Sequence, residues 1–133
     1  MITYREIKKV DLKDVKRLYA ECGWTAYLQD DARLSDAWDR SLYALGAFDG
    51  EALVGFVRCL GDGAHTVLVQ DLIVKEAYHR RGIGKELMQA VFMRFQDVRQ
   101  VFVVTDSEAE NLAFYRACGM KPLRDGNMTA FFR

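Results

Sequence analysis

The residues best suited to chemistry form the run 79–85, which reads His-Arg-Arg-Gly-Ile-Gly-Lys. Its two glycines let the backbone approach a ligand closely because they have no Cβ atom, and its basic side chains add positive charge. The preceding residues 66–74 are rich in Val, Leu and Ile, which predicts a buried strand. Apolar residues at spacings of three and four from Ile83 onward predict a helix. A strand, a basic glycine turn and a helix N-terminus together predict a phosphate-binding site.

Two common nucleotide motifs do not match this run. A Walker loop requires Gly at position 79 and Ser or Thr after Lys85, where the chain has His79 and Glu86. The dinucleotide fingerprint requires a third Gly, where the chain has Leu87. The run instead resembles the coenzyme A loop of the GNAT superfamily of N-acetyltransferases, Gln/Arg-x-x-Gly-x-Gly/Ala, with His79 replacing the usual first residue. The resemblance implies that acetyl-CoA is the cosubstrate, its pyrophosphate bound mainly by backbone N–H groups. The implied contacts are His79, Arg80, Arg81, Gly82, Ile83, Gly84 and Lys85.

Length and composition indicate a single domain spanning residues 1–133. The 19 basic residues equal the 19 acidic ones, so the bulk charge does not favour a nucleic-acid partner. No apolar run has membrane-spanning length and the N-terminus does not read as a signal peptide, so we expect a cytoplasmic protein without a membrane partner. Three widely spaced cysteines and two histidines favour reduced thiols over a disulfide framework or a metal site.

The resemblance extends over nearly the whole chain and implies the GNAT α/β fold. That fold is a central, mixed, twisted sheet of about six to seven strands flanked by about four helices, in the order β-α-α-β-β-β-α-β-α-β(-β). Turn and capping signals favour the same order. The expected strands are residues 2–7, 43–48, 52–60, 66–74, 101–105 and 127–133, and the expected helices begin at a cap on Asp11, at a cap on Ser35, at Arg81 and at a capping box on Ser107.

A second family signature is the Phe114-Tyr115 pair, followed by Gly119. By resemblance, Tyr115 would protonate the departing thiolate of coenzyme A. The alternative is that Tyr115 only packs between helix and sheet. Many members carry an Asn seven residues before this Tyr, where the chain has Glu108, so Asn111 is the nearest candidate for that coenzyme contact.

The same resemblance assigns the pantetheine arm to the backbone of Leu72, Ile73 and Val74, beside a bulge that splays two parallel strands apart. A backbone N–H near Leu72 would stabilise the oxyanion of the tetrahedral intermediate. Asp71 is the best candidate for the general base, acting directly or through water. Alternatively, Asp71 faces a helix as a satisfied structural carboxylate. Glu21 and Asp62 are poorer candidates.

The acceptor is expected against the N-terminal helices, where aromatic and acidic residues gather. They are Trp24, Tyr27, Trp38 and Tyr43, with Glu21, Asp30, Asp31, Asp36 and Asp39. Aromatic and acidic side chains together suit a cationic or aromatic amine, but a solvated acidic helix face is the interpretation that we favour for these residues.

The sequence therefore predicts an acetyl-CoA-dependent N-acetyltransferase acting by direct attack on a small primary amine in a ternary complex. The alternatives are a non-catalytic coenzyme-binding or regulatory module, and a protein or peptide N-acetyltransferase. The expected terminal strand, residues 127–133, could also pair across a homodimer.

Overall fold

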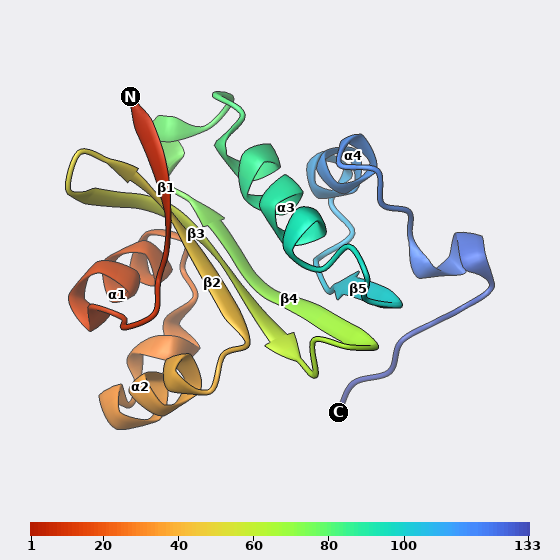
Figure 1. Cartoon of the computed structure of the whole chain (residues 1–133), viewed down its shortest axis with the longest axis horizontal. Coiled ribbons are helices and arrows are strands. Elements are labelled where there is room, and N and C mark those ends of the chain that lie inside the picture. Colours follow the sequence, from red (N-terminus) through yellow and green to blue (C-terminus); the bar gives the residue numbers. More distant parts are fainter. The chain divides into compact units, whose positions relative to one another are not determined.

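The computed structural model describes residues 1–133, and Cα packing divides them into residues 1–103 and residues 104–133. The first part contains a five-stranded sheet in the order β1-β2-β3-β4-β5 (Figure 1). Neighbours β1 to β4 are antiparallel, and β5 runs parallel to β4. The strands are β1 (Ile2–Glu6), β2 (Tyr43–Asp49), β3 (Ala52–Gly61), β4 (Thr66–Val74) and β5 (Gln100–Val103).

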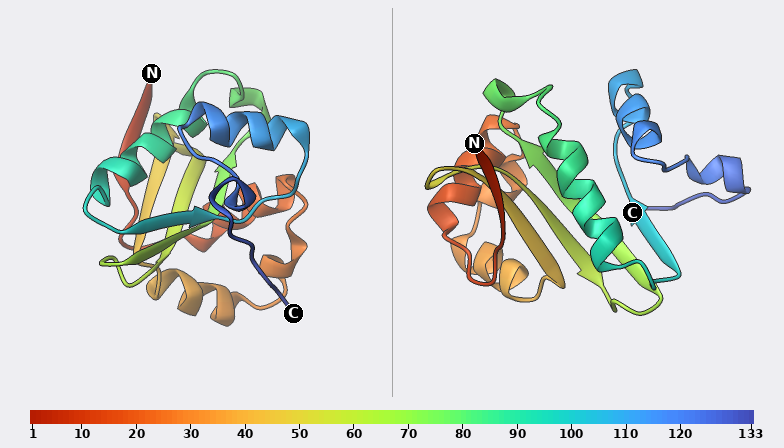
Figure 2. Two further views of the ribbon diagram at one scale, coloured as in Figure 1. Left: turned by 90° about the vertical axis from the view of Figure 1, so that its right-hand side faces the viewer. Right: turned by 45° about the horizontal axis from the view of Figure 1, so that its top comes forward.

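Helices cover both faces of this sheet (Figure 2). Helix α1 (Leu12–Glu21) and helix α2 (Asp31–Asp39) lie on one face, joined through the 3₁₀ turn η1 (Thr25–Leu28). Helix α3 (Ile83–Arg94) lies on the other face, after the 3₁₀ turn η2 (Glu76–Tyr78). The connection from β4 through α3 to β5 is the crossover that parallel neighbours require. No helix is long and apolar enough to cross a membrane.

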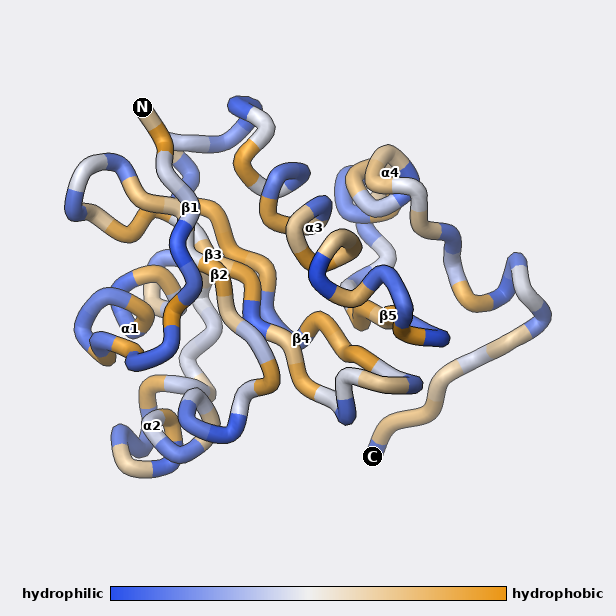
Figure 3. Tube along the Cα trace, in the orientation of Figure 1, coloured by the Kyte–Doolittle hydropathy of each residue, from blue (hydrophilic) through white to orange (hydrophobic).

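The hydrophobic residues gather on the central strands and the inner sides of the helices (Figure 3). One core cluster lies between the sheet and helices α1 and α2 and is built around Tyr19, Trp38 and Phe56, with Ile73 of β4 contributing to it. Helix α3 buries Ile83, Leu87, Met88 and Val91. These are positions of the predicted apolar stripe, so the helical periodicity is confirmed.

The predicted second helix begins at the wrong residue. Ser35 was the expected cap, whereas α2 begins at Asp31 with Asp30 as its N-cap. The Asp30 carboxylate accepts a hydrogen bond from the Arg33 N–H, which satisfies a free donor of the first turn. Ser35 therefore lies inside the helix. The cap at Asp11 is as predicted, and β2 and β3 form a hairpin with Gly50 and Glu51 as the turn residues.

Residues 104–133 contain helix α4 (Ala109–Ala117) and the 3₁₀ turn η3 (Leu123–Gly126). Gly119 follows the end of α4: it adopts φ +92° and its N–H donates to the Arg116 carbonyl, while the Met120 N–H donates to the Tyr115 carbonyl. The predicted capping box is wrong, because the N-cap of α4 is Glu108 and not Ser107, and no side chain accepts a hydrogen bond from the first turn of the helix.

The predicted terminal strand is also wrong. Residues 127–133 form no strand, and the sheet has five strands where six to seven were expected. Phe131 and Phe132 are 93% and 99% exposed. A strand requires a partner for its backbone hydrogen bonds, and no ladder forms with this segment, so its aromatic residues alone do not make it a strand.

Candidate functional site

Strands β4 and β5 separate halfway along β4. Their parallel pairing runs from Thr66 opposite Gln100 to Val69 opposite Val103, and then ends. Strand β4 continues to Val74 without β5 beside it. At the point of separation, Arg58 pairs with Asp71 and Cys59 pairs with Val69, which leaves Gln70 as an extra residue. A bulge was expected in β4 just after Asp71, and it lies just before this residue; beyond it one edge of β4 is open.

Backbone alternation shows which groups face that open edge. The Lys75 N–H donates to the Val54 carbonyl across the β3 side. In an antiparallel pair, alternate residues direct both backbone groups to the same neighbour. Ile73 therefore directs its N–H and C=O toward β3, while Leu72 and Val74 direct theirs to the open edge. Of the three residues predicted to hold the pantetheine arm, Leu72 directs its N–H and C=O to the open edge, and Val74 directs its N–H there together with a carbonyl that already accepts from His79.

The basic run forms the turn between β4 and α3. Arg80 has φ +63° and Gly82 has φ +79°, both in the left-handed region. Gly82 is the N-cap of α3 and no side chain caps this helix. The first N–H groups of α3 are therefore without a side-chain acceptor, beside the exposed cations Arg80, Arg81 and Lys85. This arrangement suits the predicted anion.

Two contacts hold the turn against the sheet. His79 Nε2 lies 2.6 Å from the Val74 carbonyl oxygen. Because a carbonyl only accepts, His79 Nε2 carries the hydrogen. The Arg81 guanidinium lies 4.9 Å from the centre of the Tyr78 ring, and the Tyr78 hydroxyl donates to Asp49 at 2.6 Å. Residue 79, where the chain departs from the family pattern, thus ties the turn to the open edge of β4.

Asp71 lies at the centre of a buried polar network. Its Oδ2 accepts from Arg58 Nε at 2.6 Å and from the Tyr19 hydroxyl at 2.7 Å, and its Oδ1 accepts from the Tyr27 hydroxyl at 2.8 Å. Asp71 is only 1% exposed and Arg58 3%. Arg58 also donates to the Ser41 hydroxyl. Since Asp71 faces α1 with its oxygens engaged, these contacts favour the structural interpretation of this carboxylate over direct proton transfer.

The protonation states of this network follow from burial and charge. Burial and the Asp71 charge raise the pKa of Tyr19 and of Tyr27, so both hydroxyls keep their protons and donate. Burial alone would lower the pKa of Arg58, but the Asp71 charge and hydrogen bond outweigh it and raise the pKa. The network is therefore an ion pair with two neutral phenols.

Residues 104–133 carry the other predicted side chains. Burial, with a smaller contribution from Cys118, raises the pKa of Tyr115 to about 12. The Tyr115 ring contacts Phe114 edge to face, with ring centres 5.0 Å apart. Asn111 donates to Asp106 at 2.7 Å, so its amide already has a partner within this part of the chain.

The aromatic residues expected to line the acceptor site do not all lie together. Tyr27 stacks on Tyr19 with ring centres 4.2 Å apart, and Trp24 is 39% exposed beside them. Trp38 is buried in the core. Tyr43 instead contacts Phe95 and Arg94 at the end of α3. Of these aromatic residues, Tyr27 is the one with hydrogen bonds to Gln70 and Asp71 at the bulge.

Several of the predicted carboxylates have local roles. Asp31 pairs with Lys16 at 2.8 Å, and Asp36 pairs with Arg40 at 3.0 Å. Asp62, a poorer candidate base, accepts three backbone hydrogen bonds in the β3–β4 turn. These contacts favour the solvated-face interpretation for the acidic residues of α2.

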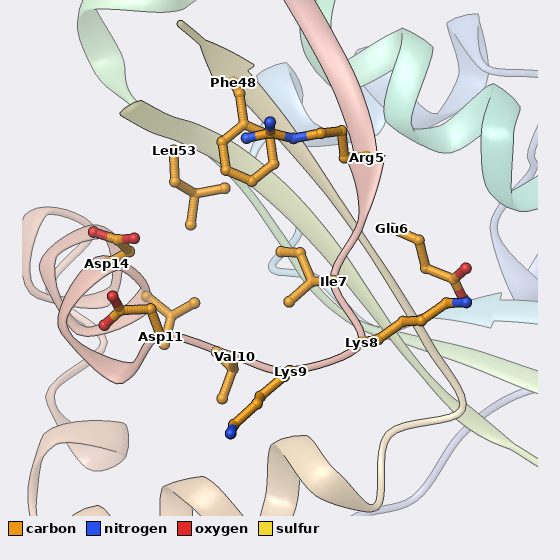
Figure 4. A pocket seen from close by; sticks show the side chains of 11 residues that line it. Arg5, Glu6, Ile7, Lys8, Lys9, Val10, Asp11, Asp14, Phe48 and Leu53 are labelled. Atoms are coloured by element: carbon orange, nitrogen blue, oxygen red, sulfur yellow. The ribbon is translucent and has the colours of Figure 1, made fainter. Parts of the chain in front are cut away.

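A separate pocket of about 370 Å³ lies between β1 and α1 (Figure 4). Its walls are apolar at Ile7, Val10 and Phe48, and the Arg5 guanidinium lies over the Phe48 ring at 4.0 Å. No residue of β4 or α3 lines it. This pocket is therefore distinct from the open edge of β4. No cluster of His, Cys, Asp or Glu could hold a metal ion.

The sequence interpretation missed Arg58, Tyr19 and Gln70. Arg58 is the only charged residue within the apolar run of β3. A charge in a buried strand requires a buried partner of opposite charge, so this signal could have predicted that Arg58 has one, although not that the partner is Asp71.

Comparison with known proteins identifies relatives over most of the chain. The model of the acetyltransferase (GNAT) family matches residues 11–120. An uncharacterized N-acetyltransferase, ycf52-like, from Prochlorococcus marinus is 28% identical over 133 residues, covering 97% of this chain and 73% of that protein. The chloroplastic GCN5-related N-acetyltransferase 3 from Arabidopsis thaliana is 30% identical over 105 residues, covering 78% of this chain and 43% of that protein.

Solved structures share the fold. The GNAT-family acetyltransferase SP0256 from Streptococcus pneumoniae TIGR4 superposes with a TM-score of 0.91 at 38% identity, covering 100% of this chain and 97% of that chain. The aminoglycoside N-acetyltransferase AAC(6')-Iy, in complex with CoA, has a TM-score of 0.77 at 20% identity, covering 100% and 94%. The second likeness concerns the fold alone.

Proposed function

Because the chain belongs to the GNAT family of acetyltransferases, we propose that it transfers the acetyl group of acetyl-CoA to a small primary amine by direct attack in a ternary complex. The observation that carries the proposal is the separation of β4 from β5 after Val69 and Val103. The basic turn 79–85, which leads into α3, lies at the end of the separated part of β4. An open strand edge and an uncapped helix N-terminus offer backbone donors and acceptors to an elongated, phosphate-bearing ligand.

The residues present fit acetyl-CoA. The turn 79–85 would bind the pyrophosphate through the first N–H groups of α3 and the charges of Arg80, Arg81 and Lys85. The N–H and C=O of Leu72 and the N–H of Val74 would hold the pantetheine arm along the open edge. We keep Asn111 as a predicted contact, and its hydrogen bond to Asp106 would have to be shared or exchanged.

Acetyl-CoA supplies an activated thioester carbonyl carbon, to which the amine nitrogen adds as the C–S bond breaks. The Leu72 N–H would stabilise the oxyanion that develops on the carbonyl oxygen. Tyr115 would give its hydroxyl proton to the leaving sulfur and regain one from solvent, while the amine nitrogen loses its extra proton to solvent. Asp71 would act through the groups that it holds, because its oxygens already accept three hydrogen bonds.

A thiol-release assay over a panel of amines tests this function. The panel contains spermidine, tyramine, free lysine, an unblocked peptide and sisomicin. Sisomicin is included because an aminoglycoside acetyltransferase solved in complex with it shares this fold. We expect acetyl-CoA-dependent release of thiol with at least one small amine.

Two other outcomes would contradict the proposal. Thermal stabilisation by acetyl-CoA without turnover on any panel member would favour the non-catalytic coenzyme-binding module. Turnover confined to the peptide would favour a protein or peptide acceptor.

A further inference from the structure

Gln70 occupies a distinctive position in β4. It is the extra residue of the bulge and the first residue of β4 beyond the end of the β5 pairing. Its side chain is exposed, yet its Nε2 donates to the Tyr27 hydroxyl at 3.2 Å. Asp71, the next residue, also contacts that hydroxyl. The bulge therefore turns two successive side chains toward the same face of the sheet, where regular alternation would separate them.

The buried ion pair fixes the direction of each hydrogen bond in this chain. Asp71, charged beside Arg58, can only accept. The Tyr27 hydroxyl has one proton, and it is donated to Asp71. The Tyr27 oxygen must then accept from Gln70, so the amide presents Nε2 to Tyr27. Gln70 Oε1 therefore points away from Tyr27, and no protein group donates a hydrogen bond to it.

The direction of this amide matters for an amine nucleophile. A neutral amine has N–H donors and one lone pair, and only the lone pair attacks a carbonyl. An acceptor such as Oε1 binds an N–H and leaves the lone pair free. A donor such as Nε2 would bind the lone pair and oppose the attack.

We propose that Gln70 Oε1 accepts a hydrogen bond from the attacking amino group, and that Tyr27 is the positioning residue that keeps this oxygen directed at the substrate. This inference rests on the proposed amine acetylation. It places the amine-binding subsite at Gln70, where β4 continues beyond β5, and makes a neutral amide the group that binds the amine. It also links the buried Asp71–Arg58 pair, through Tyr27, to the direction of an exposed side chain.

The variants Gln70→Met and Tyr27→Phe, singly and together, test the proposal with the best amine of the panel above. Gln70→Met keeps the length of the side chain and removes the acceptor. We expect it to lower kcat/KM for the amine by up to about 10-fold, the upper end of the range for one neutral hydrogen bond, with KM for acetyl-CoA unchanged. Tyr27→Phe should lower kcat/KM for the amine about 3-fold or more, because the Gln70 amide loses the hydrogen bond that fixes its direction. Gln96→Met, at an exposed glutamine beyond α3, is the matched control.

The double variant distinguishes positioning from packing. If Tyr27 acts through Gln70, Tyr27→Phe has no further effect in the Gln70→Met background. Multiplicative losses would overturn the role of Tyr27, and a Gln70→Met enzyme equal to the wild type would overturn the role of Gln70. A wild type without turnover on any amine would instead remove the proposed function, and this inference with it.

A ligand-free measurement tests the amide direction independently. In ¹⁵N spectra, Tyr27→Phe should shift the side-chain NH₂ signals of Gln70 and leave those of Gln96 in place. Unchanged Gln70 signals would contradict the hydrogen bond that fixes Oε1. Melting curves of each variant establish that it is folded, and Gln70→Ala serves as the second acceptor-free variant.

Discussion

Arg58 and Asp71 face each other across β3 and β4, with Arg58 Nε 2.6 Å from Asp71 Oδ2 and both side chains almost fully buried. The Coulomb attraction of such a pair must offset the desolvation of two charges, so the pair adds little net stability by itself. Removing one member is different, because the remaining charge stays buried and unpaired. The pair therefore fixes the pairing of β3 with β4 next to the bulge.

We expect Asp71→Asn to lower the free energy of unfolding by about 3–5 kcal/mol. The substitution leaves the Arg58 charge unpaired. It also places the NH₂ group of Asn, which only donates, beside three groups that donate to Asp71 in the wild type. Urea denaturation measures the loss. Adding Arg58→Met should cost less than the sum of the two single changes, because the two sites interact.

The exposed pair Asp36–Arg40 is the matched control, since its atoms are 3.0 Å apart on the surface of α2. Asp36→Asn should cost less than about 1 kcal/mol. A similar loss for Asp71→Asn and Asp36→Asn would contradict the importance of burial.

His79→Ala should weaken acetyl-CoA binding about 2- to 10-fold, the equivalent of one hydrogen bond of 0.5–1.5 kcal/mol. His79 Nε2 donates to the Val74 carbonyl and holds the basic turn 79–85, the proposed pyrophosphate site, against β4. His79→Gln introduces the residue typical of the family and should restore affinity to within about 2-fold. Isothermal titration with acetyl-CoA measures both.

The control for this change is His65→Ala, at the exposed histidine of the β3–β4 turn. It should bind acetyl-CoA as the wild type does. If His79→Ala also binds as tightly as the wild type, the contact with Val74 has no part in shaping the turn for the coenzyme.

Local signals predicted most of the fold. The run from Thr66 to Val74 is bounded as expected, and Gly119 closes α4 because its φ of +92° suits glycine. Both depend on residues close in sequence. The start of α2 was missed because Asp30 and Ser35 are both good caps, and nothing local decides which of them meets a free N–H.

Long-range contacts set the limit on what the sequence could predict at the site. The coenzyme turn is continuous in sequence and could be found from its residues. The partners of Asp71 lie 13, 44 and 52 residues away, at Arg58, Tyr27 and Tyr19. Residues 127–133 likewise form no strand, although they include two phenylalanines, because no neighbouring strand pairs with them. Such pairings depend on the register of the sheet, which no local pattern specifies.

Asp62→Ala should lower the melting temperature at pH 7, and the difference from the wild type should shrink in acid. Asp62 Oδ1 accepts the N–H groups of Ala64, His65 and Thr66 at 2.9, 2.9 and 3.0 Å. The Thr66 N–H, then those of Ala64 and His65, lower the pKa of Asp62 to about 2.

A carboxyl whose pKa is depressed by folding stabilises the protein fully above its unfolded pKa, near 4, and loses that contribution as pH falls through the folded value. The two melting temperatures should therefore converge between about pH 4 and pH 2. Asp97→Ala, at an exposed aspartate, is the control. A difference that does not vary with pH would mean that the charge of Asp62 is not what the turn uses.

Tyr115→Phe should lower kcat about 100-fold while leaving acetyl-CoA affinity nearly unchanged. General acid catalysis contributes roughly 10²–10⁴-fold. The lower end applies because a phenol with pKa of about 12 is a weaker acid than a thiol with pKa near 8.5.

The raised pKa of Tyr115 also keeps its acid form present, so loss of the Tyr115 proton should not reduce kcat between pH 7 and pH 10. Stopped-time thiol release across this range measures both effects, with Tyr4→Phe on the edge strand β1 as the control. Equal turnover by wild type and Tyr115→Phe would remove Tyr115 from the reaction and leave its hydroxyl a structural role. A fall in wild-type kcat near pH 9 that persists in Tyr115→Phe would assign that ionisation to another group.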